Sequence, residues 1–591
     1  MNQEIGKVIE SAHGHIGISI NDATIFERFK RELQIGKYIK VQDGNHDYIL
    51  ASVQNVKVVN KENDDNDQYV LTAQPIGTLI LNESSYDFKQ GSVSLPLPTE
   101  KAFLMERDEY DSVFKKNKEF SFELGTLVQN KNINLHIDGN KFFGKHIAIV
   151  GSTGSGKSNA VAKIIQEVVG IENSKNKNLN IQKNSHIVIF DIHSEYKSAF
   201  TICDEEEFNL NYLDVEKLKL PYWLMNSEEL EFLFIESKEQ NSHNQVSQFK
   251  KAVILNKEKY NQKLVGKITY DTPIYFNINE VYNYITNINN EIYARNSNDP
   301  HKPKLADGTF IDDKNDYFSE ILNFTEPSAK TANKTNNGPF YGEFNRFLSR
   351  LETKINDKRL DFMQLDQAEI GRKYKTSDFS EIIKQFLGYL DQSNITIIDL
   401  SGIPFEVLSI TTSLISRLIF DFAFHYSKLK HNLKQTNDIP FMIVCEEAHN
   451  YIPKKGGSQY SSSKKSLERV AKEGRKYGLS MMVISQRPSE VSETIFAQCS
   501  NFIALRLTNV QDQNYIKSLL PENSNSITDV LPTLAAGECL VVGDATPLPS
   551  LVQLDKPNPQ PKSENVRVHS EWQKRWVSIE FEDVIKKWRN E

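Results

Sequence analysis

The sequence is short of cysteine and has no excess of positive charge, and these shortages exclude several classes of protein. Four cysteines occur in 591 residues, Cys203, Cys445, Cys499 and Cys539, without the spacing of a metal knuckle or a disulfide framework. The 70 Lys and Arg against 78 Asp and Glu give a net charge of −8, so the whole surface is not drawn to phosphate or anionic lipid. Any nucleic-acid site must therefore be a local basic lining.

Long apolar runs also look scarce. No run of the sequence approaches the 18 residues that a membrane-spanning helix needs, and the start, MNQEIGKVIESAHG, lacks the apolar stretch of a signal peptide. We therefore expect a cytoplasmic protein with no membrane partner. A hydrophobic content of 39% is enough for folded cores, and the length predicts two to four domains.

Short β patterns separated by Asn, Asp and Gly turns fill the first hundred residues. The runs are Gly17–Ile20, Tyr38–Val41, Asp47–Val59 and Gln68–Ile76. They predict a small β-barrel domain over residues 1–100. A polar stretch, Lys115–Lys118, then precedes a second β-rich segment that ends near Asn140.

An α/β pattern follows, in which apolar runs of four to six residues alternate with helical spacing, as in a buried parallel sheet. The runs are His146–Val150, His186–Phe190, Ile395–Asp399, Phe441–Cys445, Ser480–Ile484, Phe502–Leu507 and Cys539–Val542. We predict an α/β domain over residues 101–202 and 386–560. A helical insertion subdomain, residues 203–385, interrupts it, with helical spacing in Glu228–Phe234 and Asn345–Leu351.

The C-terminal segment, residues 561–591, holds three of the four tryptophans, Trp572, Trp576 and Trp588. So many large aromatic side chains are costly to leave in water. We expect this segment to dock onto the protein, within the chain or across a subunit boundary.

The strongest chemical signal is the stretch GSTGSGKS, which fits the P-loop pattern G-x-x-x-x-G-K-[ST] between a strand and the helical run Asn159–Val169. Its residues are Gly151, Ser152, Thr153, Gly154, Ser155, Gly156, Lys157 and Ser158, followed by Asn159. The glycines let backbone N–H groups converge on phosphate, Lys157 neutralises the β- and γ-phosphates, and Ser158 holds Mg²⁺. The pattern predicts a site for ATP and Mg²⁺.

Two acids follow a buried strand at Phe441–Cys445. In a P-loop fold this position supplies a metal-shell carboxylate, here Glu446, and a water-activating glutamate, here Glu447. A glutamate that polarises water favours hydrolysis over transfer to a small-molecule acceptor. A second strand ends in Asp191-Ile-His193-Ser-Glu195 and adds polar groups at the same edge of the sheet.

Several motifs together resemble the HerA family of hexameric ATPases, within the HerA/FtsK branch of P-loop motors. They are GSTGSGKSN, DIHSEY, PYWLM, FNRFLSRLE with KRLDFM, CEEAHNYIP, KEGRKYGLSMMVISQRP, FIALRLTN and GECLVVGDATPLPS, and they span essentially the whole chain. The resemblance implies an α/β fold with a RecA-like P-loop motor domain and helical insertion, preceded by a β-barrel of the HerA/ATP-synthase type. It also implies a homohexameric ring around double-stranded DNA in a central pore.

The resemblance assigns roles to further residues. Gln486 resembles a γ-phosphate-sensing glutamine, and Arg475 resembles an arginine finger that reaches a neighbouring subunit's nucleotide, because a guanidinium stays charged and spreads over several phosphate oxygens. Lys476 or Arg487 could be the contact instead. The family commonly has Asp-Pro-His-Gly-Glu-Tyr where this chain has Ile192 and Ser194.

A Gly/Ser-rich stretch, Pro453–Ser466, carries lysines just after the acidic pair and suits a mobile pore loop that contacts the DNA backbone, although a solvated loop has the same composition. These lysines are Lys454, Lys455, Lys464 and Lys465.

The leading hypothesis is an ATP-driven DNA translocase or helicase that acts with a separate nuclease or other effector, in DNA end processing or anti-phage defence. The sequence has no recognisable nuclease carboxylate or His-metal cluster, so strand cleavage is expected in another polypeptide. The alternative is a ring-shaped ATPase scaffold that assembles and gates a sirtuin-like or nuclease effector.

Overall fold

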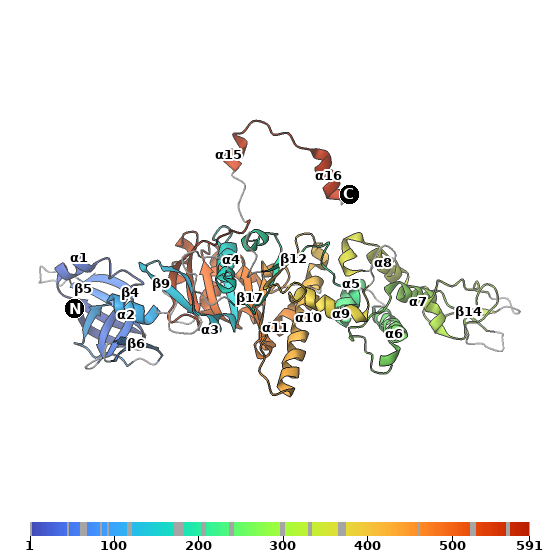
Figure 1. The fold of residues 1–591 in the computed structure, drawn as a ribbon, viewed down its shortest axis with the longest axis horizontal. Helices are drawn as coiled ribbons and strands as arrows, with labels where there is room; N and C mark the ends of the chain where they lie inside the picture. The colour runs from blue at the N-terminus through green and yellow to red at the C-terminus, as the bar shows by residue number, and fades with distance from the viewer. Residues whose placement is uncertain are drawn as a thin grey trace.

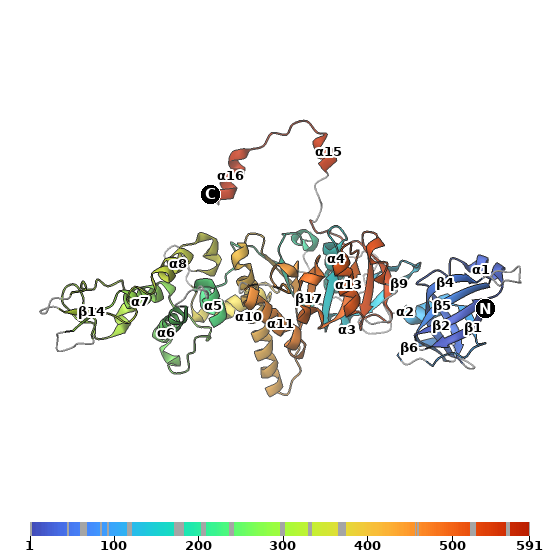
Figure 2. The same cartoon turned by 180° about the vertical axis from the view of Figure 1, so that it is seen from behind.

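In a computed structural model of the chain, a barrel, an α/β motor domain and a helical insertion lie in a row (Figure 1). Figure 2 shows the same row from behind, with the C-terminal helices standing away from it in both views. The structure describes residues 3–12, 14–43, 47–59, 68–82, 85–91, 94–114, 121–170, 182–201, 209–235, 242–295, 302–328, 334–364, 374–455, 457, 460–520, 528–562 and 568–589. Cys203 and the polar stretch Lys115–Lys118 lie outside these residues.

The N-terminal barrel is an antiparallel sheet in the order β2-β1-β7-β3-β4-β5-β6, closed by pairing of β2 with β5. Its elements are β1 (Glu4–Ala12), β2 (His15–Ile20), α1 (Ala23–Phe29), β3 (Tyr38–Asp43), β4 (Asp47–Val59), β5 (Gln68–Asn82), β6 (Ser85–Gln90) and β7 (Lys101–Leu104). Closure removes most unpaired strand edges and encloses an aliphatic core. Because β7 pairs with β1 and β3, the barrel runs past residue 100, the end predicted from the sequence.

The motor domain is built on one sheet in the order β12-β15-β11-β16-β17-β10-β18-β19-β20-β8-β9. Its strands are β8 (Ser121–Leu127), β9 (Asn130–Asp138), β10 (His146–Val150), β11 (His186–Asp191), β12 (Leu210–Leu213), β15 (Ile395–Asp399), β16 (Phe441–Cys445), β17 (Leu479–Ser485), β18 (Cys499–Leu505), β19 (Glu538–Gly543) and β20 (Ser550–Leu554). Strands β12 to β18 in this order are mutually parallel. The predicted α/β fold with a RecA-like motor and an N-terminal barrel is confirmed.

Two sequence predictions about this sheet need correction. The run Cys539–Val542 was expected in the parallel sheet, but β19 is antiparallel to β18. The strand β12 lies within the predicted insertion range, yet it pairs with β15 and extends the motor sheet.

Helices cover both faces of the sheet. Successive side chains of β10 point to opposite faces and therefore pack against different helices. Ile147 and Ile149 pack with α4 (Lys157–Val169), whereas Ala148 and Val150 share a core with α10 (Phe405–Asn432) and α11 (Ser461–Glu473). Shorter helices complete the domain: α2 (Arg107–Phe114), α3 (Gly139–Phe143), α12 (Glu493–Phe496) and α13 (Val510–Leu519). The buried cysteines Cys445, Cys499 and Cys539 are free thiols in this core.

Helix α10 is long and apolar enough to cross a membrane, by length and composition alone. The expectation that no run of the chain reaches that length is therefore wrong for this helix. However, 78% of its most apolar window is buried inside the protein. Its composition is accounted for by packing against the sheet and the insertion.

The insertion is mainly helical, as predicted, and forms the end of the row opposite the barrel (Figure 1). Its elements are α5 (Ser227–Phe234), α6 (Ser242–Tyr260), α7 (Ile278–Asn290), α8 (Asn345–Ile355) and α9 (Phe379–Phe386), with the small hairpin-like pair β13 (Ile292–Ala294) and β14 (Thr335–Asn337). Its core is continuous with that of the motor, and Arg417 on α10 bonds Glu229 on α5 at 2.8 Å. The insertion is thus fixed to α10.

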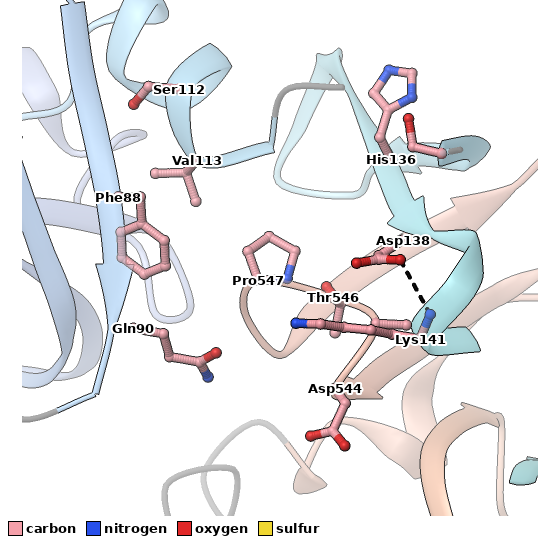
Figure 3. Close-up of a pocket in the computed structure, with 12 residues that line it drawn as sticks. Phe88, Gln90, Ser112, Val113, His136, Asp138, Lys141, Asp544, Thr546 and Pro547 are labelled. Atoms are coloured by element: carbon pink, nitrogen blue, oxygen red, sulfur yellow. Dashed lines mark hydrogen bonds between the residues drawn. The ribbon is translucent and has the colours of Figure 1, made fainter. Parts of the chain in front are cut away.

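The barrel meets the motor across a gap of about 250 Å³ between β6, α2, β9 and the turn after β19 (Figure 3). Asp138 and Lys141 on the motor side face Phe88 and Gln90 of β6, and the Asp138 carboxylate caps the backbone N–H of Lys141 at 3.1 Å. The Tyr38 hydroxyl donates to the carbonyl of Pro549 at 3.0 Å, a direct hydrogen bond between the barrel and the motor domain.

The C-terminal helices α15 (Val568–Trp572) and α16 (Phe581–Arg589) do not dock onto their own chain. Trp572, Trp576 and Trp588 are 84%, 100% and 84% exposed. Among the described residues, these two helices therefore do not dock within the chain, one of the two expected arrangements, and docking onto another chain stays a prediction.

Candidate nucleotide-binding and hydrolysis site

The glycine-rich loop joins β10 to α4 at the carboxyl edge of the parallel strands. Gly154 (φ 73°) and Gly156 (φ 103°) adopt the left-handed conformation that favours glycine. The Ser152 N–H donates to the carbonyl of Arg506 at 2.8 Å, which ties the loop to the end of β18. No side chain caps α4 at Lys157, so the first N–H groups of the helix are available to an anion.

The remaining predicted nucleotide-binding residues, Gly151, Thr153, Ser155, Ser158 and Asn159, lie in this loop or in the first turn of α4. The Ser155 hydroxyl and the Asn159 side-chain oxygen are buried and have no hydrogen-bond partner among the described residues. Unpartnered buried polar atoms are uncommon in folded proteins, and these two fit a loop that takes a polar ligand.

Glu447, Lys157 and Gln486 come together at this loop from the segments that follow three different strands, β16, β10 and β17. A Glu447 carboxylate oxygen lies 3.8 Å from Lys157 Nζ, and the other accepts a hydrogen bond from the backbone N–H of Gln486 at 3.3 Å. The Gln486 side-chain oxygen accepts from the Thr153 hydroxyl at 2.5 Å. His449 Nδ1 is 3.4 Å from the same Glu447 carboxylate.

Burial dominates the electrostatics of the lysine. It lowers the pKa of Lys157, while the charges of Glu447, Glu446 and Glu195 oppose that shift. Glu447 itself has φ 42°, which places this non-glycine residue in the left-handed region, at a cost that functional sites commonly tolerate. The carboxylate is thereby directed at the glycine-rich loop.

Glu446 lies deeper in the sheet than Glu447 and is turned toward β11. Its carboxyl accepts from the Ile192 N–H at 3.2 Å and is hydrogen-bonded to Asp191. Burial, with the nearby charges of Asp191 and Glu195, raises the pKa of Glu446 well above its usual range. The metal-shell role predicted for Glu446 stays a prediction.

The turn after β11 contributes a contact that the sequence did not indicate. Glu195 accepts a hydrogen bond from the Ser158 hydroxyl at 2.8 Å, and the Asp191 carboxylate accepts from the Glu195 N–H at 3.1 Å. The adjacent Ser194 donates to Asp399, at the end of β15, at 2.8 Å. The acids that follow β11 in the sequence indicated polar groups at this edge of the sheet. Which residue Glu195 contacts could not be predicted, because that depends on the order of the strands.

Arg475 lies at the opposite, amino edge of the sheet, between α11 and β17. It is exposed, and its charge acts on His146 at the start of β10, the pKa of which is lowered to about 4, chiefly by burial. The seven residues of β17 separate Arg475 from Gln486, roughly 20 Å of extended chain. Arg475 therefore does not reach the glycine-rich loop of its own chain.

Lys476 and Arg487, the two alternatives to Arg475 as the contact to a neighbouring nucleotide, lie at different edges of the motor sheet. Lys476 is exposed beside Arg475, whereas Arg487 follows β17 at the carboxyl edge and bonds Glu490 at 2.8 Å. Arg487 is thus near its own nucleotide site.

The stretch Pro453–Ser466 is only partly a loop, because α11 begins at Ser461 and includes the serine tract. The Ser463 hydroxyl is buried and bonds Ser409 of α10 at 2.8 Å, which explains why this polar tract forms a helix. Lys454 pairs with Glu493 at 2.6 Å, and Lys465 pairs with Glu228 at 2.7 Å. Lys464 donates to the carbonyl of Lys454 at 3.2 Å.

A strand, glycine-rich loop and helix with an opposed lysine, glutamate and glutamine define a P-loop ATPase. Residues 122–419, half of the chain, match the sequence model of the helicase HerA central domain. The chain belongs to the HerA helicase family, as the sequence motifs indicated.

Several curated relatives match nearly end to end. A probable helicase of Methanocaldococcus jannaschii is 22% identical over 96% of this chain and 95% of its own length. The DNA double-strand break repair helicase HerA of Sulfolobus acidocaldarius is 24% identical over 96% of this chain and 97% of its own length. The protein of the same name from Saccharolobus solfataricus is 24% identical over 91% of this chain and 92% of its own length.

Among solved structures, VirB4 of Thermoanaerobacter pseudethanolicus aligns with 74% of this chain and 97% of its own at 14% identity and a TM-score of 0.41. The bacterial conjugative coupling protein TrwB aligns with 78% of this chain and 94% of its own, at 11% identity and a TM-score of 0.38.

Proposed function

We propose that the protein is an ATP-driven DNA translocase or helicase that works as a homohexamer around double-stranded DNA. The position of Arg475 supports the ring hypothesis: this arginine is exposed and lies a strand's length from its own P-loop, so a nucleotide that it contacts belongs to another subunit. The relatives named as DNA double-strand break repair helicases support DNA as the substrate.

In this proposal Glu447 is the general base. Its carboxylate, held by the Gln486 N–H and facing Lys157, is positioned to accept a proton from the water that attacks the γ-phosphate. Lys157 stabilises the charge on the phosphates, and the Gln486 side chain, bonded to Thr153 of the loop, senses the γ-phosphate. Arg475 of an adjacent subunit completes the transition-state charge stabilisation.

The residues present fit Mg²⁺. Ser158 and the carboxylates of Glu195, Glu446 and Glu447 are hard oxygen donors, and this metal uses few protein ligands when phosphates and waters supply the others. Bound Mg²⁺ would neutralise charge on the β- and γ-phosphates; Ser158 and Glu446 would hold it.

The partner is proposed to be a separate nuclease or sirtuin-like effector, with the protein acting in the cytoplasm in DNA end processing or anti-phage defence. The neighbouring reading frames in the genome are the first place to look for it.

One observation favours the alternative, a ring-shaped scaffold that gates an effector. Lys454 and Lys465, expected to contact DNA, are neutralised by Glu493 and Glu228. That leaves less positive charge for a DNA backbone than the sequence implied.

The test is the ATPase rate with and without duplex DNA, together with the mass of the assembly by light scattering. The translocase hypothesis expects a mass near six times 67.7 kDa and DNA-stimulated turnover. A hexamer without DNA stimulation, even with its partner added, would favour the scaffold. A monomeric active ATPase would contradict both.

A further inference from the structure

Arg475 is carried by a short turn at the amino edge of the motor sheet, between α11 and β17. The turn is the 3-10 helix η10 (Gly474–Tyr477), and Gly478 follows it in the left-handed conformation, with φ 76°. The Arg475 guanidinium is exposed and forms no hydrogen bond or ion pair with any residue that the structure describes. No neighbouring side chain holds the guanidinium, so the place of the arginine depends on the conformation of the turn.

The turn fits closely against the strand that follows it and against helix α10. Gly474 leaves no room for a side chain, because a Cβ there would lie 2.7 Å from the carbonyl oxygen of the first residue of β17. The Tyr477 ring packs edge-on against the rings of Phe420 and Phe424 in α10, with centroids 5.8 and 5.1 Å away. These contacts hold the turn at both of its ends, on either side of the arginine.

Asn437, in the segment between α10 and β16, binds the end of the turn through its side chain. Its amide nitrogen donates to the carbonyl of Tyr477 at 2.7 Å, and its amide oxygen accepts from the N–H of Ile439 at 3.1 Å. Because the oxygen and the nitrogen of the amide are both bonded, the group is fixed in its orientation. A Cβ on Gly478 would lie 2.6 Å from the same amide nitrogen, so the contact also requires glycine there.

The segment that holds the turn leads directly into the strand that carries the acidic pair. Asn437 precedes β16, and the N–H of Phe441, the first residue of β16, donates to the carbonyl of Gly478 at 2.8 Å. All five residues of β16 are buried, and the strand lies between β11 and β17. The turn of Arg475 is therefore anchored to a buried strand inside the sheet.

We propose that Asn437 is a positioning residue that fixes the turn from which Arg475 reaches the nucleotide of an adjacent subunit. The inference rests on the proposed action of Arg475 in trans. An arginine that reaches across an interface is more effective when its backbone is already held in the productive position, because ordering it during binding costs free energy. Without the bond to the Tyr477 carbonyl, the turn samples further conformations, and the guanidinium contacts the neighbouring phosphates for less of the time.

The steady-state ATPase of the assembled full-length protein tests this, with Asn437→Ala made in the wild type and in Arg475→Ala. In the wild-type background, kcat is expected to fall roughly 2- to 10-fold, the factor for one hydrogen bond, while nucleotide affinity stays unchanged. In the Arg475→Ala background, the same change is expected to have no further effect on kcat, because Asn437 acts through the arginine. A merely structural role would lower kcat by the same factor in both backgrounds.

Asn394→Ala is the matched control. Asn394 also precedes a parallel strand at the amino edge, β15, and its side chain donates to the carbonyl of Lys183 at 2.9 Å instead of to the turn of Arg475. Its loss should leave kcat nearly unchanged. If Asn437→Ala is not folded by circular dichroism, Asn437→Ser keeps an acceptor for the Ile439 N–H but is too short to reach the carbonyl of the turn, and the same dependence on Arg475 is expected.

A wild-type kcat in folded Asn437→Ala would overturn the proposal, as would an equal fall in the two backgrounds. Arg475→Ala alone reports on the proposed function: if its turnover matches the wild type, the action of Arg475 in trans fails, and the positioning role falls with it. If Arg475→Ala is slow and Asn437→Ala is not, the proposed function stands and only the role of Asn437 is wrong.

Discussion

The two edges of the motor sheet differ in how much of their chemistry one chain completes. At the carboxyl edge, Lys157, Ser158, Glu447 and Gln486 engage each other or the glycine-rich loop within one chain. At the amino edge, Arg475 is exposed and meets no phosphate-binding element of its own chain. From this difference we expect nucleotide binding to be a property of the single chain, and fast hydrolysis to be a property of an assembly.

Lys157→Ala should have the largest effect, because it removes the cation that neutralises the phosphates at the edge complete within one chain. We expect nucleotide binding to fall below detection in a fluorescent-nucleotide titration, in the isolated chain and in any assembly alike. Near-normal affinity of this variant would remove the P-loop from the mechanism.

Arg475→Ala tests the amino edge of the motor sheet, where we expect the arginine to act on the nucleotide of another chain. We expect nucleotide affinity to be retained and turnover in the assembly to fall by about 10³-fold, the scale of arginine fingers. Mixed with Glu447→Gln subunits, it should recover part of the activity, because some interfaces then pair an intact arginine with an intact base.

The mixing experiment needs hexamers shown to contain both variants, for example by native mass spectrometry. Complete absence of recovery in such rings would assign Arg475 a structural role. Lys476→Ala and Arg487→Ala, measured in parallel, separate the neighbouring cations: the second lies at its own chain's carboxyl edge and should not be rescued in trans.

Glu447→Gln should lower turnover by about 10²-fold or more while nucleotide binding stays intact, because the amide keeps the shape but does not accept the water's proton. A steady-state ATPase assay measures the turnover, and a nucleotide titration measures the binding. Wild-type turnover in this variant would contradict its assignment as the base.

Neutralising the lysines Lys454, Lys455, Lys464 and Lys465 to Gln should reduce DNA-stimulated ATPase several-fold and leave basal ATPase unchanged, with an effect that shrinks as salt is added. Neutralising Lys428, Lys430, Lys434 and Lys472 near the amino edge is the matched control for lost charge. Equal effects of both sets would show that net charge, and not a pore loop, supports DNA stimulation.

The smallest effect is expected at the turn that holds Glu195. Ser194→Ala keeps the left-handed strain but loses the bond to Asp399, so we expect a loss of roughly 1–2 kcal/mol in the free energy of unfolding. Ser194→Gly loses the same bond but relieves the strain and should be nearly neutral. Denaturant titration compares them; an equal loss in both would show that strain is absent here.

Much of the fold could be predicted because its signals are contiguous. The strand, glycine-rich loop and helix around Lys157 occupy one unbroken stretch, and each buried parallel strand carries its own apolar run. The predicted family and enzyme class are also confirmed. They could be predicted because the motifs that indicate them are read along the sequence, without knowing the strand order. The catalytic roles of Glu446, Glu447, Gln486 and Arg475 stay predictions.

The sequence by itself determined that the chain binds nucleotide through a P-loop, since backbone geometry over eight neighbouring residues makes that site. Only the tertiary structure decided which distant groups meet there. Thr153 reaches Gln486 across 333 positions and Tyr212 approaches Asp399 across 187, because the order β12-β15-β11-β16-β17-β10 sets which strand ends are neighbours. Strand order is a choice among packings of similar apolar runs, and no local pattern encodes it.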